Sequence, residues 1–387
     1  MGLLVSIHRL VPDMLLVAIT LLMHVGFYLA IRGTSRFSGS RRNRMLLGVG
    51  LAVSVAYVSL SMVFSMNRFA SLLPVGEWLY WLRGMGYLWA LGTFAVFTML
   101  MLMRRVPAGF SGGRRRFLNM ARGAALASPA VIIGYGVGER KKFEVKEADI
   151  AIPGLAKDLE GLRILQLSDI HMSPFLTEKD LERVIGMANE TKPHLCVITG
   201  DLITGRRDPL DVCMRHLAKV KSDAGIIGCN GNHEIFARAE AHTKEYGARL
   251  GMNFLRQEKT ALRFGSARMN IAGVDYQRFH APYLRGMEKL VERDAFNLLL
   301  SHNPDVFPVA AKQGYQLTLS GHTHGGQITV EILEQYANVA RFFTPYVYGR
   351  YERDGASIYV TRGIGTVGVP ARIGATPEIT VVRLCAS

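Results

Sequence analysis

Long apolar stretches in the N-terminal third constrain the fold more than any other feature of this sequence. Two of them contain no charged residue, a third contains only Asp13, and a weaker fourth contains Arg122. About 20 apolar residues are enough for a helix to cross the hydrocarbon core of a bilayer. We therefore predict a bundle of three or four transmembrane helices, at about residues 10–31, 45–66, 84–103 and 117–138.

The charge of the chain is concentrated in the same region. Residues 1–143 hold 17 Lys and Arg against 3 Asp and Glu, a net charge of +14, whereas residues 144–387 hold 29 against 28, a net charge of +1. Because the positive excess accompanies the apolar stretches, it favours a membrane partner and excludes a nucleic-acid one. We expect a membrane domain at 1–143 and a folded, water-soluble domain at 144–387.

Basic clusters predict the orientation of the spans. One cluster lies between the first and second spans and another follows the third, and positive loops stay in the cytoplasm. Arg114-Arg115-Arg116 resembles a twin-arginine export motif, and an ordinary basic flank would give the same topology. If the fourth stretch spans the membrane, the domain at 144–387 lies outside the cytoplasm, and this is the topology that we expect.

The pattern changes after residue 143 to short apolar runs bounded by turn residues. Runs of this kind predict buried strands, and the segments between them have helical spacing. Strands that alternate with helices indicate βαβ units and an α/β fold. The predicted strands are 163–167, 195–198, 225–229, 295–300 and 316–319, and the predicted helices include 178–189 and 210–220.

Polar side chains follow five of these strands at the first loop positions. Ligands of α/β sheets bind outside the carboxyl ends of strands, so we expect these side chains to converge. Carboxylate, imidazole and amide donors without Cys suit Mn, Fe or Zn better than Ca. The order of the motifs along the chain is a stronger signal than any one of them. The candidate metal ligands are Asp169, His171, Asp201, Asn232, His302, His322 and His324.

This order of motifs resembles that of the calcineurin-like metallophosphoesterase superfamily. Its members carry Asp-x-His, Gly-Asp, Gly-Asn-His-Glu, His and Gly-His-x-His in the same order along the chain. The resemblance covers about residues 144–384 and is closest to the membrane-anchored bacterial branch, on the segments 165–171, 321–327, 359–365 and 377–379. It implies a four-layer α/β/β/α sandwich. With the predicted spans, it implies a multi-pass protein of the bacterial inner (plasma) membrane with its catalytic domain on the extracytoplasmic face.

The resemblance also assigns roles to the motif residues. Two divalent metal ions would be bound, with Mn favoured over Fe or Zn, and a metal-bound hydroxide would attack the phosphorus of a phosphate ester. Asp169, His171 and His324 would hold one ion, Asn232, His302 and His322 the other, and Asp201 would bridge them. His233 would be catalytic, stabilising charge or protonating the leaving oxygen.

One departure from the superfamily pattern is visible, since Thr204 stands where an Asp is common three residues after the bridging position. Because Thr204 is not one of the candidate ligands, this departure leaves the metal site intact but leaves open which residues hold the ligands in place. A second motif, at 363–368, fits Gly-x-Gly-x-x-Gly, but Pro370 would end the helix that a dinucleotide site needs, so the pattern favours a tight loop near the metal site.

Two alternative functions stay open at this point. A pyrophosphohydrolase acting on a nucleotide-linked lipid precursor, of the UDP-diacylglucosamine type, would suit a membrane-anchored enzyme. A metal-binding module without catalysis would have lost some ligands, and the full set of seven argues against it. We expect a phosphorylated substrate, with a lipid-linked one among the options.

Overall fold

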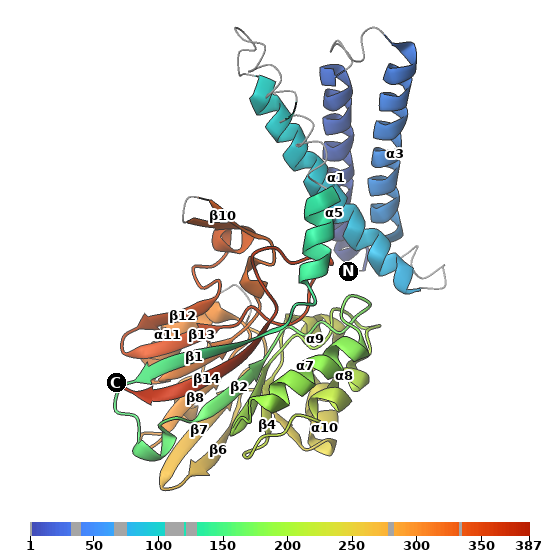
Figure 1. The fold of residues 1–387 in the computed structure, drawn as a ribbon. Coiled ribbons are helices and arrows are strands. Elements are labelled where there is room, and N and C mark those ends of the chain that lie inside the picture. Colours follow the sequence, from blue (N-terminus) through green and yellow to red (C-terminus); the bar gives the residue numbers. More distant parts are fainter. Residues whose placement is uncertain are drawn as a thin grey trace. The chain divides into compact units, whose positions relative to one another are not determined.

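The structure is a computed structural model that describes residues 2–31, 40–65, 76–104, 120, 130–277, 282–332 and 335–387 (Figure 1). The chain divides into two compact units. The first comprises Met1–Val137 with Gly368–Pro370, and the second comprises Gly138–Val367 with Ala371–Ser387.

The described part of the first unit contains three long helices: α1 (Gly2–Ile31), α3 (Arg41–Ser65) and α5 (Glu77–Arg104). Met23 and Phe27 of α1 are buried together with Val96 of α5. The His24 ring lies 2.7 Å from the Ser54 hydroxyl through Nε2, and the Trp89 indole N–H donates to the same hydroxyl at 2.7 Å. A small polar cluster therefore joins all three helices.

Two helical segments of this unit, Arg41–Ser61 and Glu77–Leu102, are long and apolar enough to cross a membrane. The apolar segments Val17–Leu29 and Ala130–Glu139 are shorter. Most of the predicted fourth span, 117–138, lies outside the described residues. Length and composition thus support two of the predicted spans, and the bundle of three or four is not confirmed.

The second unit contains two mixed six-stranded sheets and a two-stranded ribbon. In the first sheet β2 to β5 run parallel, and in the second β7, β8, β9 and β13 run parallel. In sheet order, the first has β1 (Glu144–Ile152), β14 (Glu378–Ala386), β2 (Arg163–Leu167), β3 (Leu195–Thr199), β4 (Ile226–Cys229) and β5 (Met252–Phe254). The second has β12 (Gly349–Arg353), β13 (Ala356–Val360), β9 (Leu317–Ser320), β8 (Phe296–Leu300), β7 (Ala267–Gly273) and β6 (Glu258–Phe264). The ribbon pairs β10 (Thr329–Ile332) with β11 (Gln335–Asn338).

Helices cover the outer faces of the two sheets. Their bounds are α7 (Glu178–Glu190), α8 (Leu210–Leu217), α9 (Asn232–Ala237), α10 (Glu240–Arg249) and α11 (Phe307–Gln313). The 3-10 helices are η1 (Lys157–Leu159), η2 (Met287–Leu290), η3 (Pro304–Val306), η4 (His324–Gly326) and η5 (Val339–Phe342).

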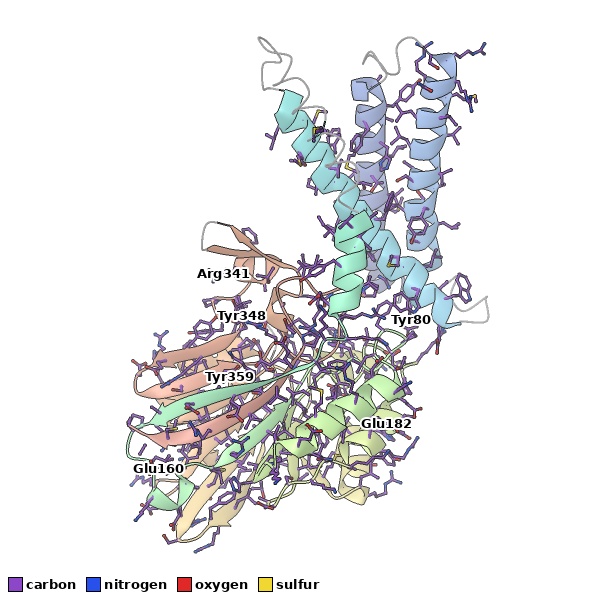
Figure 2. The ribbon with its side chains drawn as sticks, in the orientation of Figure 1. Tyr80, Glu160, Glu182, Arg341, Tyr348 and Tyr359 are labelled. Carbon is purple, nitrogen blue, oxygen red and sulfur yellow. The ribbon has the colours of Figure 1, made fainter. Side chains whose placement is uncertain are left out.

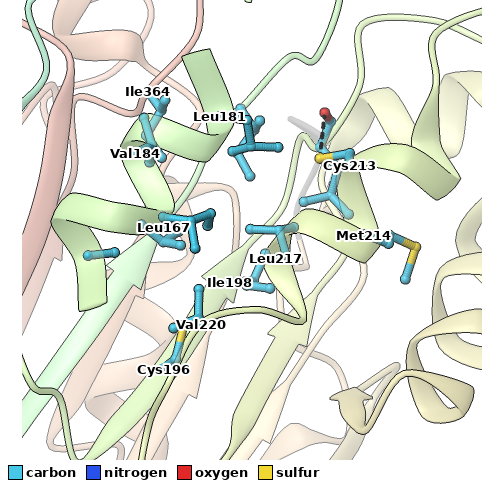
Figure 3. Packing of buried hydrophobic residues seen from close by; sticks show 14 of the residues in the cluster. Leu167, Leu181, Val184, Cys196, Ile198, Cys213, Met214, Leu217, Val220 and Ile364 are labelled. Carbon is cyan, nitrogen blue, oxygen red and sulfur yellow. Dashed lines mark hydrogen bonds between the residues drawn. The ribbon is translucent and has the colours of Figure 1, made fainter. Parts of the chain in front are cut away.

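Buried apolar clusters show how these layers pack. Leu181 of α7 and Leu217 of α8 pack with Ile198 of the first sheet (Figure 3). Residues of both sheets form a second cluster between them, and Phe307 of α11 packs on Ile358 at the far face of the second sheet. The two sheets and their covering helices fit the predicted α/β/β/α sandwich.

Helix α7 illustrates how far the local sequence determines an element. Thr177 caps its first turn: the Thr177 hydroxyl accepts from the Asp180 N–H, and the Asp180 carboxylate accepts from the Thr177 N–H. This capping box satisfies two backbone donors that would otherwise lack a partner. The buried residues Leu181, Val184 and Ile185 recur at helical spacing and face the sheet. The predicted helix at 178–189 is confirmed.

Candidate metal centre

The seven candidate ligands follow the carboxyl ends of strands from both sheets. In chain order, β2 is followed by Asp169 and His171, β3 by Asp201, β4 by Asn232, β8 by His302, and β9 by His322 and His324. Parallel strands end at the same edge, so the topology brings these loops together.

One group of ligand atoms comes from Asp169, His171 and His324, all of which are buried. The two Nε2 atoms of His171 and His324 lie 3.1 Å apart, and His324 Nε2 lies 3.4 Å from Asp169 Oδ1. Two atoms that each lie about 2.1 Å from the same cation are about 3.0–3.4 Å apart at right or tetrahedral angles. The spacing of this group therefore suits one cation.

A second group consists of Asp201, His302 and His322. His302 Nε2 lies 3.0 Å from Asp201 Oδ2, and the same oxygen lies 3.5 Å from His171 Nε2 in the first group. Asp201 Oδ2 thus stands between ligands of both groups, which is the location expected of a bridging carboxylate.

Asn232 Oδ1 is buried and has no hydrogen-bond partner, and His302 Nε2 faces Asp201 Oδ2 at 3.0 Å without a well-aligned hydrogen bond. The other ring nitrogen of His302, Nδ1, donates to the Thr199 carbonyl at 2.6 Å. Leaving a buried polar atom unpaired costs about 1–3 kcal/mol, so such atoms usually have a partner. A divalent cation would supply one for both atoms, and the residues present therefore fit metal binding.

Five of the seven candidate ligands have a positive φ, in the left-handed region that non-glycine residues rarely adopt. The values are 51° for Asp169, 46° for His171, 55° for Asp201, 76° for His322 and 53° for His324. Such conformations cost on the order of 1–3 kcal/mol each and concentrate at functional sites. The surrounding fold therefore stabilises these five residues in a backbone conformation that is locally unfavourable.

Glu234 is a site residue to which the sequence analysis gave no role. Its buried carboxylate accepts three backbone N–H groups, from Gly231 and Asp201 at 2.8 and 2.9 Å through Oε2, and from Leu202 at 2.8 Å through Oε1. Gly231 itself allows the two loops to touch, because a Cβ at this position would clash with the Asp201 backbone and carboxylate. In the sequence, the feature that could have pointed to Glu234 is its position at the end of the Gly-Asn-His-Glu motif.

Thr204 supports the site despite its departure from the superfamily pattern. Its hydroxyl lies 3.2 Å from Nδ1 of His171, and its carbonyl accepts a hydrogen bond of 2.6 Å from Nδ1 of His233. The first contact orients a candidate ligand. The second fixes the orientation of the candidate catalytic residue.

His233 lies at the rim of the ligand cluster. Its backbone N–H donates to Asp201 Oδ1 at 2.9 Å, and its half-buried ring meets the His171 ring edge to face at 4.7 Å. Since the Thr204 carbonyl accepts from Nδ1, the Nε2 atom carries the lone pair of the neutral ring. His233 also forms a close group with His171 and Asp201, so it lies within reach of anything bound there.

Burial and mutual charge shift the pKa values of the site. Burial raises the pKa of Asp169 to about 6 and lowers the pKa of His171 to about 3. For His302, burial is outweighed by the carboxylates of Asp201 and Asp169, which raise its pKa to about 9; in return His302 helps to hold the pKa of Asp201 well below its usual value despite burial. Without a cation, His302 therefore carries the positive charge that the carboxylates require.

Two histidines outside the ligand motifs have structural partners, and the glycine motif lies beside the site. His194 Nδ1 accepts from the Arg163 N–H, and His242 pairs with Asp211 at 2.6 Å. His280 lies outside the described residues. The glycine motif at 363–368 begins as a tight loop beside the ligands, as predicted, with the Gly365 N–H donating to the Asp169 carbonyl at 2.7 Å.

Several known proteins are similar to this chain in sequence. The family model for calcineurin-like phosphoesterases matches residues 162–326. The uncharacterized metallophosphoesterase YkuE of Bacillus subtilis is 33% identical over 288 residues, which cover 70% of this chain and 97% of that protein. A Danio rerio transmembrane protein with metallophosphoesterase domain is 31% identical over 280 residues, covering 67% of this chain and 62% of that protein. An uncharacterized metallophosphoesterase of Campylobacter jejuni, Cj0846, is 30% identical over 247 residues, covering 63% and 64%.

Proposed function

Since the chain belongs to the calcineurin-like phosphoesterase family and is a hydrolase of phosphate esters, we propose that it binds two divalent cations at the clustered Asp, His and Asn side chains and is anchored in a membrane. Oxygen and imidazole nitrogen donors suit Mn, Fe or Zn, and Mn is the metal that we favour among them.

The observation that carries the two-cation proposal is the location of Asp201 Oδ2. It lies 3.0 Å from His302 Nε2 in one group and 3.5 Å from His171 Nε2 in the other. A carboxylate oxygen that lies between ligands of both groups suits a pair of cations that share it. The unpaired Asn232 Oδ1 supports the assignment of Asn232 to the second group.

Paired cations supply charge stabilisation for the phosphate oxygens and acidify bound water. The chain itself orients the ligands and moves protons. The Thr204 carbonyl holds Nδ1–H of His233, so that Nε2 is the nitrogen free to exchange a proton with a leaving oxygen. The N–H of His233, through Asp201 Oδ1, ties this residue to the bridging carboxylate.

Membrane anchoring rests on the helical unit. Its described helices expose large apolar side chains, such as Leu22 at 72%, Val53 at 62% and Leu91 at 54%. Exposed apolar surface of this extent is typical of a membrane or protein contact. Two relatives are named transmembrane proteins. We place the protein in the bacterial inner membrane with its catalytic unit on the extracytoplasmic face, on the basis of the basic clusters in the sequence.

The proposed substrate is a phosphorylated compound, with a lipid-linked phosphate ester among the options. No observation in the described part of the chain favours the pyrophosphohydrolase alternative. The non-catalytic alternative has no support, because the seven ligands and His233 are all present.

The test uses the full chain in detergent, stripped of metal and reloaded with Mn. We expect about two Mn per chain and hydrolysis of nitrophenyl phosphate that depends on Mn, for the reason that paired cations activate water. One Mn or none in folded, active protein would contradict the two-cation site. Reporter fusions after Lys142 test the orientation independently.

A further inference from the structure

Arg372 is the largest fully buried side chain among the residues that the structure describes. Its guanidinium donates to backbone carbonyls on several sides. Nε donates to Gly365 at 3.0 Å, and Nη1 donates to Arg362 at 2.9 Å and to Ala375 at 3.1 Å. Nη2 donates to Gly363 at 3.1 Å. A buried cation is retained only where its donors are satisfied, and these carbonyls satisfy them without an ion-pair partner in direct contact.

The loop that Arg372 holds lies directly against the first group of ligands. The Ile364 and Gly365 N–H groups donate to the carbonyls of Ser168 and Asp169 at 3.1 and 2.7 Å. Gly365 has no room for a side chain, because a Cβ there would clash with the Ile170 carbonyl. The loop therefore follows the backbone of Asp169 closely, at the point where this residue has a positive φ.

Arg372 also contacts a candidate ligand of the same group. Nη1 donates to the His324 carbonyl at 3.3 Å, and Nη2 lies 3.4 Å from His324 Nδ1. The opposite ring nitrogen, Nε2, faces His171 and Asp169. The guanidinium therefore lies behind the ring of His324. Because a guanidinium can only donate, it holds this residue through the bond to its carbonyl and by packing against the ring.

The second group has other supports. His302 Nδ1 donates to Thr199, and His322 Nε2 lies 3.4 Å from the Tyr276 hydroxyl. Within the described residues, no hydrogen bond connects Arg372 to either of these histidines. Its contacts are confined to the loop and to the side of the site that holds Asp169 and His324.

We propose that Arg372 is a positioning residue that sets the metal affinity of the group formed by Asp169, His171 and His324 and leaves the group formed by Asp201, His302 and His322 unaffected. It does so by fixing the loop behind Asp169 and the ring of His324. This inference rests on the proposed two-cation site.

The test compares Arg372→Lys with Arg383→Lys in the full chain in detergent. Lysine keeps the positive charge but has three donors on one nitrogen, so it cannot serve carbonyls on several sides. Arg383 is the matched control, because it is also tightly bonded, to Asp149 at 2.5 and 2.7 Å, but at the exposed end of β14. The readouts are Mn bound per chain, Mn dissociation constants and the Mn(II) EPR spectrum of metal-free protein titrated with Mn.

We expect two Mn and a spin-coupled spectrum for the unchanged chain and for Arg383→Lys. For Arg372→Lys we expect one tightly bound Mn with an uncoupled spectrum, and a second Mn bound 10–100-fold more weakly, the usual effect of removing a residue that orients a ligand. Adding His302→Ala to Arg372→Lys should then remove the remaining Mn.

Three other results are possible, and each would contradict either the positioning role of Arg372 or the two-cation site. Two Mn with unchanged affinities in Arg372→Lys would overturn the positioning role alone. Equal weakening of both ions, or failure of the metal-free variant to fold, would overturn it as well, because Arg372 would then support the whole unit. Fewer than two Mn in the unchanged chain would instead refute the proposed function on which the inference rests.

Discussion

Replacing Glu234 by Gln tests how the site is held together, because it changes charge and one acceptor but hardly any volume. The carboxylate accepts N–H groups from Gly231 and Asp201 through one oxygen and from Leu202 through the other. Glutamine has a single acceptor oxygen. If this oxygen keeps Gly231 and Asp201, the amide NH2 faces the Leu202 N–H, and that donor loses its partner.

The size of the effect follows from these three bonds. A hydrogen bond to a charged group contributes about 1.5–3 kcal/mol and a neutral one about 0.5–1.5, so the two retained bonds lose about 1 kcal/mol each. The unpaired Leu202 N–H costs about a further 1–3 kcal/mol. Removing a buried charge returns part of this, since burial raises the pKa of Glu234 and so disfavours its ionised form. We expect a net loss of about 2–4 kcal/mol in the free energy of unfolding.

The assay is thermal unfolding of the metal-free full chain, followed by Mn titration. At about 2–4 °C per kcal/mol, Tm should fall by roughly 4–16 °C. Mn affinity should fall about 10–100-fold, because the backbone on both sides of Asp201 loses its support. Glu182→Gln is the control, since this side chain is 58% exposed (labelled in Figure 2) and should shift stability by less than about 0.5 kcal/mol. An unchanged Tm and Mn affinity in Glu234→Gln would refute the reasoning.

Further predictions concern ligands, catalysis and metal. His302→Ala and His324→Ala should each lose bound Mn and activity, whereas the surface variant His242→Ala should keep both; equal Mn contents in the three would contradict the ligand assignment. His233→Ala should retain Mn but lose about 10²–10⁴-fold in kcat for alkyl esters and less for nitrophenyl esters, which need little protonation of the leaving group; an equal loss for both would reject the general-acid role. Chelation should lower Tm by about 11–22 °C, the effect of losing two ligands that are each present at 100 times their Kd, and an unchanged Tm after complete Mn removal would contradict a shared metal site.

The strands and the polar residues that follow them were predictable from the sequence, because an apolar run and the polar residues after it are both local patterns. Strand β2 has the predicted bounds, and β8 begins one residue after the predicted start. Each ligand follows its strand within a few residues, so the parallel strands of the first sheet bring Asp169 and Asp201 to one edge. That His302 of the second sheet meets them depends on how the two sheets pack.

The supports of the site were not predictable in the same way. Arg372 lies 48 residues from His324 in sequence, and no periodicity or motif indicates that its guanidinium fills the space behind that ring. The parallel pairing of β1 with β14, at opposite ends of the second unit, likewise depends on packing between distant segments. Tyr359, which is labelled in Figure 2, illustrates the same limit, because its hydroxyl donates to the carboxylate of Glu378, 19 residues away in sequence.

The central claim is that one set of seven side chains binds two cations through a shared carboxylate. Anomalous diffraction from crystals of the Mn-loaded full chain tests it most directly. The account predicts two Mn peaks about 3.5–4 Å apart, the spacing of two-metal hydrolytic sites, with Asp201 between them, Asp169, His171 and His324 at one, and Asn232, His302 and His322 at the other. A single peak, or peaks that do not share Asp201, would contradict it.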